Sequence, residues 1–443
     1  MMSRFRSSYL SVLLTIVVTL VFATTSFAAP SASTSKNKKK EARIAESARA
    51  QRHMARLRHK RAVAHRAVAA HSKSKAGART AVAGETSGTV VAASLTTKSA
   101  RSARLRRRRS RYVEQFYTSS YATDASDGDD ARGEDAVVRQ AAIDALGNMN
   151  GTVVAIDPSS GRILAMVNQK LALSEGAQPC STIKVSVALA ALSEGLISRE
   201  TEVSLGGHSQ MTLTQALAHS NNAYFESVGR QLGFPKVSYY AHQFGLGELA
   251  GYHIQGEHLG TYPTQEIDQK LGGVGKMCSF GEGISMTPLQ LGALVSAIAN
   301  GGTLYYLQHP TTPEEAVAFQ PKIKRQLEIS DVIPELSDGM TGAVQYGTAR
   351  SLRTNFSEEQ ILGKTGTCSK NGTRFGWFTS YANTQHGHIV TVIFLRGGRP
   401  TSGPKTAEIT GRFYRNLYDH NFFAEPPAAT TQNTLQKAVS GQQ

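Results

Sequence analysis

Cysteine is scarce in this sequence. Three cysteines occur among the 443 residues, and no C-x-x-C pair is present. An odd and small number leaves at least one thiol unpaired within the chain and cannot build a disulfide framework. The spacing does not resemble a zinc site, and His386 and His388 on a predicted strand are interpreted as surface residues. We therefore expect no metal and no other cofactor, and we interpret the cysteines as small, partly buried side chains.

A long uninterrupted apolar segment is also missing. The apolar run Tyr9–Phe22 is broken by three hydroxyl residues, and a membrane-spanning helix needs about 20 apolar residues. Arg4 and Arg6 precede the run, and Ser26–Ala28 follows it with small residues, as in a secretory signal. We expect residues 1–28 to be a cleaved signal peptide, with a retained membrane anchor as the alternative. Both place the remaining chain in the periplasm or on the outer face of the cytoplasmic membrane.

Acidic and large apolar residues are rare in the segment that follows. From Lys36 to Arg111 there are 23 Lys and Arg against three Glu, a net charge of +20, whereas residues 112–443 carry a net charge of −6. Too few apolar side chains are present to form a core, so residues 29–134 are predicted to be a mostly disordered basic tail. Within this segment no Phe, Tyr or Trp that could stack on a base occurs before Tyr112, which argues against nucleic acid. An anionic lipid or envelope polymer is the expected partner.

Residues 135–425 have the pattern of one folded domain, with a second disordered tail at 426–443. Two strand-like runs joined by a short turn, 151–158 and 162–167, predict a hairpin. Further strands are predicted at 360–367, 374–382 and 388–395, and helices at 181–195, 212–232, 287–300, 333–346 and 407–418. The expected fold class is α/β (α+β), an antiparallel sheet flanked by helices.

The first candidate catalytic pair opens the first predicted core helix. Ser181 and Lys184 are three residues apart, so both side chains lie on one helical face. A buried lysine with a lowered pKa can take the proton of a serine hydroxyl and activate it as a nucleophile. The N–H of Ser181, near a helix N-terminus, can donate to a developing oxyanion. The same S-x-x-K spacing recurs in the basic tail, so it is weak evidence when taken alone.

Two further motifs follow in order. Ser220 and Asn222 could relay a proton to a leaving amine and hold a substrate carbonyl. Lys364-Thr365-Gly366-Thr367 lies on a predicted strand. There Lys364 and the threonine hydroxyls suit an anionic substrate end, and Gly366 lets a ligand backbone approach the strand. S-x-x-K, an S-x-N triplet and K-T-G in this order mark penicillin-binding proteins and class A β-lactamases.

The chain from about residue 152 to 415 resembles the transpeptidase domain of monofunctional, class B-like penicillin-binding proteins. The similar segments, besides the three motifs, are 155–166, 178–184, 244–247, and 281–290 with 299–302. The resemblance implies a β-lactamase/transpeptidase-like fold with an all-helical subdomain, and action on peptidoglycan stem peptides and β-lactams. It implies that the penultimate D-alanine carbonyl acylates Ser181 and that Lys184 is the base.

The resemblance also assigns the remaining motif residues. Ser220 and Asn222 would serve proton relay and the substrate amide. Lys364, Thr365 and Thr367 would hold the terminal carboxylate, and the N–H groups of Ser181 and Thr367 would form the oxyanion hole. We find no counterpart of the N-terminal pedestal module of class B enzymes and no glycosyltransferase domain, so a bifunctional enzyme is not expected.

Several alternatives stay open. A D,D-carboxypeptidase shares the acylation half of the reaction. A serine β-lactamase is disfavoured, because no E-x-x-L-N loop follows Asn222 and the class D S-x-V triplet is absent. A non-catalytic β-lactam sensor or wall-binding module would keep the same residues. A G-x-S-x-G hydrolase is disfavoured too, because the segment around Ser209 lacks the final glycine.

Position 180 is cysteine where the family usually has glycine. If the family fold holds, Cys180 and Cys368 lie on opposite sides of one cleft and could approach each other. A disulfide, which requires Cα atoms within about 7 Å, would then stiffen or block the cleft. We expect the simpler arrangement, in which Cys180 packs under the helix and Cys368 points away.

Overall fold

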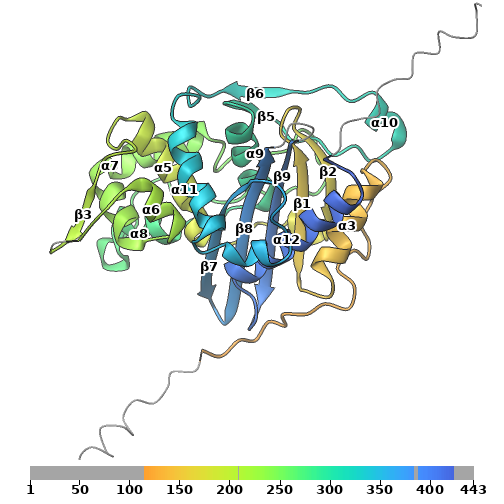
Figure 1. The fold of residues 1–443 in the computed structure, drawn as a ribbon, viewed down its shortest axis with the longest axis horizontal. Coiled ribbons are helices and arrows are strands. Elements are labelled where there is room, and N and C mark those ends of the chain that lie inside the picture. The colour runs from red at the N-terminus through yellow and green to blue at the C-terminus, as the bar shows by residue number, and fades with distance from the viewer. Residues whose placement is uncertain (1–113, 208, 384–387, 424–443) are drawn as a thin grey trace, which may run out of the picture. The chain divides into compact units, whose positions relative to one another are not determined.

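A five-stranded antiparallel sheet forms the centre of the domain (Figure 1). The computed structural model describes residues 114–423, apart from 208 and 384–387. The predicted signal peptide, residues 29–113 of the predicted basic tail, the C-terminal tail and His386 lie outside these residues. The strand order is β2-β1-β9-β8-β7. The bounds are Gly151–Asp157 (β1), Arg162–Val167 (β2), Ile361–Lys370 (β7), Thr373–Asn383 (β8) and His388–Gly397 (β9).

Strands β1, β2 and β9 have nearly continuous apolar sequences, as expected where both faces of a sheet are covered. Along β1, Val153 and Ala155 belong to one apolar cluster, and Val154 and Ile156 to the other. Helices α3 (Ala136–Leu146) and α12 (Gly403–Asp419) pack on the first face, and α9 (Pro288–Ala299) packs on the second (Figure 1). The predicted antiparallel sheet with flanking helices is confirmed.

A helical lobe lies beside strand β7 (Figure 1). Its members are α5 (Lys184–Ser193), α6 (Leu213–Ala218), α7 (Asn222–Gln243), α8 (Gly273–Phe280) and α11 (Ile333–Gln345). Helix α5 is buried from Lys184 to Leu192, as expected of a helix that is apolar all round. The lobe corresponds to the all-helical subdomain that the resemblance implied.

Short elements complete the described part of the chain. They are α4 (Gln169–Ala172), η1 (Cys180–Ile183), β3 (Val203–Gly206), β4 (Ser209–Met211), η2 (Gln269–Leu271), β5 (Thr303–Tyr305), α10 (Pro313–Val317), β6 (Ile323–Gln326) and η3 (Arg350–Thr354). Within this part of the chain, no helix has the length and hydropathy needed to cross a bilayer.

Two boundaries differ from those expected from the sequence. The single helix predicted at 212–232 is wrong, because the chain leaves the helix between α6 and α7 and turns at Ser220, where φ is 54°. Residues 114–134, assigned to the basic tail, include side chains that contact the domain. Asp129 pairs with Arg139, and Glu134 pairs with His309. The acidic end of this segment therefore belongs to the packed structure.

Strand β7 is at the edge of the sheet, with its open side toward η1 and the helical lobe. An edge strand keeps unpaired backbone groups that an extended peptide can bind. The predicted nucleophile and the predicted K-T-G segment therefore meet where the sheet and the lobe adjoin.

Candidate active site

Ser181 lies in the 3-10 turn η1, directly before α5. The sequence predicted an α-helix from Ser181, whereas the α-helix begins at Lys184. Strand β7 approaches this turn closely, since a Cβ atom on Gly366 would lie 2.9 Å from the carbonyl oxygen of Pro179. Glycine at 366 is therefore required by the packing of η1 against β7. The expectation that it also lets a ligand approach stays a prediction.

Lys184 is fully buried, and its side-chain nitrogen is surrounded by neutral oxygens. Its Nζ lies 3.0 Å from Ser181 Oγ, 2.6 Å from Asn222 Oδ1, 2.8 Å from the Ser220 carbonyl oxygen and 3.2 Å from Ser220 Oγ. Burial lowers the pKa of Lys184 to about 7, and the more distant carboxylate of Glu226 opposes this shift. Lysine at this position can therefore lose its proton near neutral pH.

The geometry suits a neutral lysine acting as a base. A neutral amine has two N–H groups and one lone pair, whereas an ammonium has three donors and no acceptor. The two N–H groups of Lys184 can donate to Asn222 Oδ1 and to the Ser220 carbonyl, its two nearest oxygens. The lone pair is then left to accept the hydroxyl proton of Ser181.

The turn between α6 and α7 presents Ser220 and Asn222 to this lysine. Asn221 is the N-cap of α7, with its side chain accepting from the N–H of Tyr224. Ser220 has a left-handed backbone, a conformation that is uncommon for serine and is found at functional sites. Asn221 thus ends the turn and caps α7, while the side chains of Ser220 and Asn222 face Lys184.

Lys364 on β7 reaches the same point from the other side, and Thr365 is its neighbour on the strand. Lys364 Nζ lies 2.8 Å from Ser220 Oγ, so this hydroxyl lies between two lysines. Lys364 is fully buried, and burial, followed by the charge of Lys184, holds its pKa well below the usual range. The predicted site residues from all three motifs are therefore brought together, and their chemical roles stay predictions.

Two further residues support the β7 hydroxyls and were missed in the sequence. Thr348 Oγ1 lies 2.7 Å from Thr365 Oγ1, and the Thr348 N–H donates to the carbonyl of Ala218. The N–H of Gly403 at the start of α12 donates to Thr367 Oγ1 over 2.7 Å. Neither residue belongs to a motif with catalytic spacing. Only the fold brings them to β7.

The expectation that Cys180 and Cys368 lie apart is wrong. They form a disulfide whose Cα atoms are 5.6 Å apart, although 188 residues separate them in the chain. The physical reason is the close packing of η1 on β7 at Gly366, which places the two cysteines opposite each other. Cys278 is a free, buried thiol, and burial raises its pKa to about 12. The interpretation as a small buried side chain therefore holds for Cys278.

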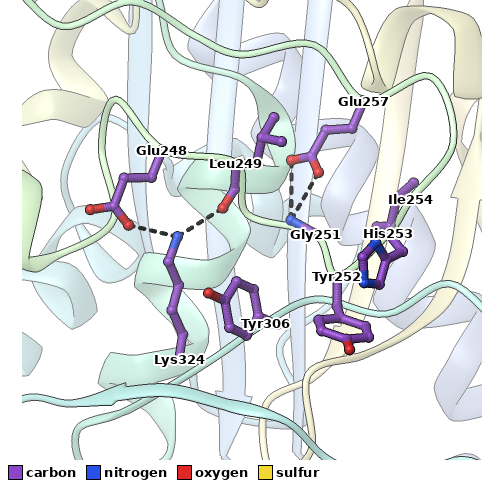
Figure 2. A pocket seen from close by; sticks show the side chains of 9 residues that line it. All are labelled: Glu248, Leu249, Gly251, Tyr252, His253, Ile254, Glu257, Tyr306 and Lys324. Carbon is purple, nitrogen blue, oxygen red and sulfur yellow. Dashed lines mark hydrogen bonds and ion pairs between the residues drawn. The ribbon is translucent and has the colours of Figure 1, made fainter.

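A separate cavity of about 500 Å³ lies elsewhere on the domain and contains none of the predicted site residues (Figure 2). Lys324 in this cavity is paired with Glu248, and Glu257 accepts from the N–H of Gly251. The two carboxylates and the lysine of this cavity are thus already paired within the protein. In the part of the chain that the structure describes, no cluster of three or more potential metal ligands occurs.

A family model described as the penicillin binding protein transpeptidase domain matches residues 151–415. The chain belongs to this family. The matched residues include the sheet, the helical lobe and all three motifs. Proteins of this transpeptidase family act on peptidoglycan stem peptides and bind β-lactams.

Curated relatives agree with the family match. Stage V sporulation protein D of Bacillus subtilis is 29% identical over 261 residues, covering 49% of this chain and 39% of that protein. Peptidoglycan D,D-transpeptidase PbpA of Mycolicibacterium smegmatis is 27% identical over 330 residues, covering 59% and 66%. The chain spans about half the length of the curated relatives it matches.

Solved structures show the same fold. The transpeptidase domain of Burkholderia pseudomallei penicillin-binding protein 3 aligns with a TM-score of 0.56 and 18% identity, covering 67% of this chain and 98% of that one. A D,D-transpeptidase domain from Eggerthella lenta aligns with a TM-score of 0.52 and 20% identity, covering 65% and 82%. The penicillin-binding transpeptidase fold predicted from the motifs is confirmed.

Proposed function

We propose that this protein is a peptidoglycan D,D-transpeptidase that forms an acyl-enzyme on Ser181. The observation that carries the proposal is the 3.0 Å contact between Ser181 Oγ and the fully buried Lys184, whose pKa is lowered to about 7. A serine hydroxyl beside a base that is uncharged near neutral pH is an activated nucleophile. The names of the curated relatives support the same activity.

Acylation follows from this geometry. Lys184 takes the hydroxyl proton as Ser181 Oγ attacks the carbonyl carbon of the penultimate D-alanine. The N–H groups of Ser181 and Thr367 stabilise the oxyanion. When the intermediate collapses, the peptide C–N bond breaks, an ester forms on Ser181, and the leaving amine needs a proton. Ser220 Oγ, 3.2 Å from Lys184 Nζ, can relay the proton from that lysine to the amine.

The other lysine suits the terminal carboxylate of the stem peptide. Lys364 is fully buried, and burial together with the neighbouring charge of Lys184 depresses its pKa. An incoming carboxylate beside Lys364 and Thr365 would favour the ammonium form again. The resulting charged hydrogen bonds are stronger than neutral ones. Substrates that end in a free carboxylate are therefore selected.

The group that attacks the acyl ester on Ser181 distinguishes a transpeptidase from a carboxypeptidase and from a β-lactamase. An amine from a second stem peptide gives a cross-link, whereas water gives carboxypeptidase activity or, with a β-lactam, hydrolysis of the drug. We place the reaction outside the cytoplasm, because residues 1–28 have the pattern of a secretory signal and residues 36–111 form a basic segment suited to anionic envelope polymers or lipids. Both segments are inferred from the sequence alone.

Intact-mass measurement with a penicillin tests the proposal. We expect an adduct of one drug molecule that persists for hours, because no deacylating glutamate loop follows Asn222. Ser181→Ala should abolish the adduct and leave the thermal midpoint nearly unchanged. Hydrolysed drug released within seconds would indicate a β-lactamase, and the absence of any adduct on wild-type protein would contradict the acyl-serine function.

An assay with a stem pentapeptide distinguishes a transpeptidase from a carboxypeptidase and from a non-catalytic sensor. With a purified donor ending in D-alanyl-D-alanine and an added amine acceptor, a transpeptidase releases D-alanine and forms the cross-linked product. Release of D-alanine without cross-linked product would indicate a carboxypeptidase. A protein that binds penicillin but leaves the donor intact would be a sensor.

A further inference from the structure

The disulfide connects the two backbone segments on either side of the proposed reaction centre. Cys180 directly precedes Ser181, and Cys368 directly follows Thr367. Each half of the bridge is therefore one residue away from a proposed oxyanion-hole N–H. A covalent bond at this place sets the distance between the turn η1 and the strand β7, whose N–H groups must act on one oxygen atom.

The backbone of Cys180 needs such support. Its φ is 53°, in the left-handed region that glycine adopts freely and that a residue with a Cβ atom disfavours. Two residues earlier, the carbonyl of Gln178 accepts from Trp377 Nε1 on β8 over 3.0 Å. The hydrogen bond from Trp377 thus fixes the segment at Gln178 to β8, and the disulfide fixes Cys180 itself to β7.

We propose that the Cys180–Cys368 bridge positions Ser181 and Thr367 for acylation by holding Cys180 in the conformation that glycine would adopt unaided. The proposal rests on the acyl-serine function argued above. It makes acylation sensitive to a dithiol reductant. The reductant donates two electrons and two protons to the S–S bond, leaves two cysteine thiols and becomes a cyclic disulfide. Cys368 is half-buried and is the more exposed half of the bridge, since Cys180 is fully buried.

The chain offers variants that separate the bridge from the backbone conformation. Cys368→Ser removes the bridge and keeps a Cβ atom at residue 180. The double variant Cys180→Gly/Cys368→Ser also lacks the bridge, but its glycine adopts a positive φ without support. Cys278→Ser, which removes the buried free thiol, is the control for effects of the reductant on other cysteines.

The experiment measures the rate of labelling by a fluorescent penicillin on the full-length proteins, with and without dithiothreitol. Thiol counting on denatured protein should find one free thiol in the oxidised wild type and three after reduction. We expect reduction, or Cys368→Ser, to slow acylation by about 10- to 100-fold, the scale of a misplaced oxyanion donor or an error of about 1 Å in positioning. The double variant should recover most of the rate and show no response to reductant.

Each outcome bears on one claim. Wild-type protein that is not labelled in the oxidised form would contradict the proposed function. Labelling of Cys368→Ser at the wild-type rate would overturn the positioning role while leaving that function intact. A double variant as slow as Cys368→Ser would show that the effect does not act through the backbone at 180. A general loss of stability cannot imitate the expected pattern, because both variants lack the bridge and only one should regain the rate.

Discussion

Lys184 is the residue whose charge state should set the pH dependence of acylation. Only its neutral form can accept the proton of Ser181, and burial places its pKa at about 7. Below pH 7 the ammonium form predominates, so the rate should fall about tenfold per pH unit as the neutral fraction falls. Above pH 7 it should reach a plateau. The measurement is the second-order rate of acylation between pH 5 and 9 with a penicillin whose carboxylate stays ionised in this range.

Removing this amine provides the control for the pH profile. Lys184→Ala should slow acylation by about 10²–10⁴-fold, the usual contribution of general base catalysis, and should abolish the inflection near pH 7. Lys170→Ala, at an exposed lysine on α4, should leave both unchanged. If the pH profile of acylation by Lys184→Ala keeps the inflection near pH 7, the titrating group is another residue of the site.

At the scale of elements, the segment after α11 joins two motifs. Gly347 and Thr348 pack against the end of α6, which leads into Ser220, and Thr348 also contacts Thr365 on β7. Thr348→Val keeps the shape and removes the hydroxyl that orients Thr365. A net hydrogen bond contributes about 0.5–1.5 kcal/mol, so the penicillin concentration for half-maximal acylation should rise about 2- to 10-fold. The limiting rate should stay near that of wild type.

The matched control is Thr354→Val, at an exposed threonine of η3 that lies a few residues further along the chain. It should change neither the half-maximal concentration nor the limiting rate. If Thr348→Val lowers only the limiting rate, Thr348 acts on the chemistry and not on the binding of the carboxylate.

The spacing of residues along the sequence predicted the helices and strands better than it predicted the contacts between them. The strands β1 and β2 and the helix α9, which has a capping box of Thr287 and Gln290, carry their signals within a few residues. The Ser181–Lys184 pair is also local, so helical geometry predicted that the two side chains meet, and the order of the three motifs distinguished this pair from the same spacing in the basic tail. The break at Ser220 was missed because apolar residues at helical spacing continue on both sides of it, although Ser220 and Asn221 themselves favour caps and turns.

The remaining contacts of the site are long-range. Lys364 reaches Ser220 across 144 residues, and Cys180 reaches Cys368 across 188. Pairing of the cysteines depends on how closely η1 approaches β7, and this distance is set by Gly366 and not by any spacing in the sequence. The resemblance to a family placed Ser220 and Lys364 in one site but did not predict the contact between them, and the cysteine at position 180 lay outside the family pattern.

On the scale of the whole molecule, charge is divided between two parts. Residues 36–111 carry a net charge of +20, and residues 112–443 carry −6. The catalytic domain thus contributes no excess of positive charge that could attract an anionic envelope. Any electrostatic attachment to the envelope must therefore come from the basic segment, which lies outside the described residues and whose charge is known from the sequence.

Deleting residues 36–111 should therefore loosen envelope association and leave acylation of Ser181 by penicillin unchanged. Each basic residue near an anionic surface contributes about 1 kcal/mol, and salt screens this attraction. Raised salt should accordingly release the full-length protein from isolated envelopes, as measured by sedimentation and labelling of both fractions. The deletion variant should stay in the supernatant at low and high salt. A variant that lacks only residues 1–28 separates this tether from a membrane anchor, and its salt-insensitive retention would point to a specific partner instead of electrostatic attraction.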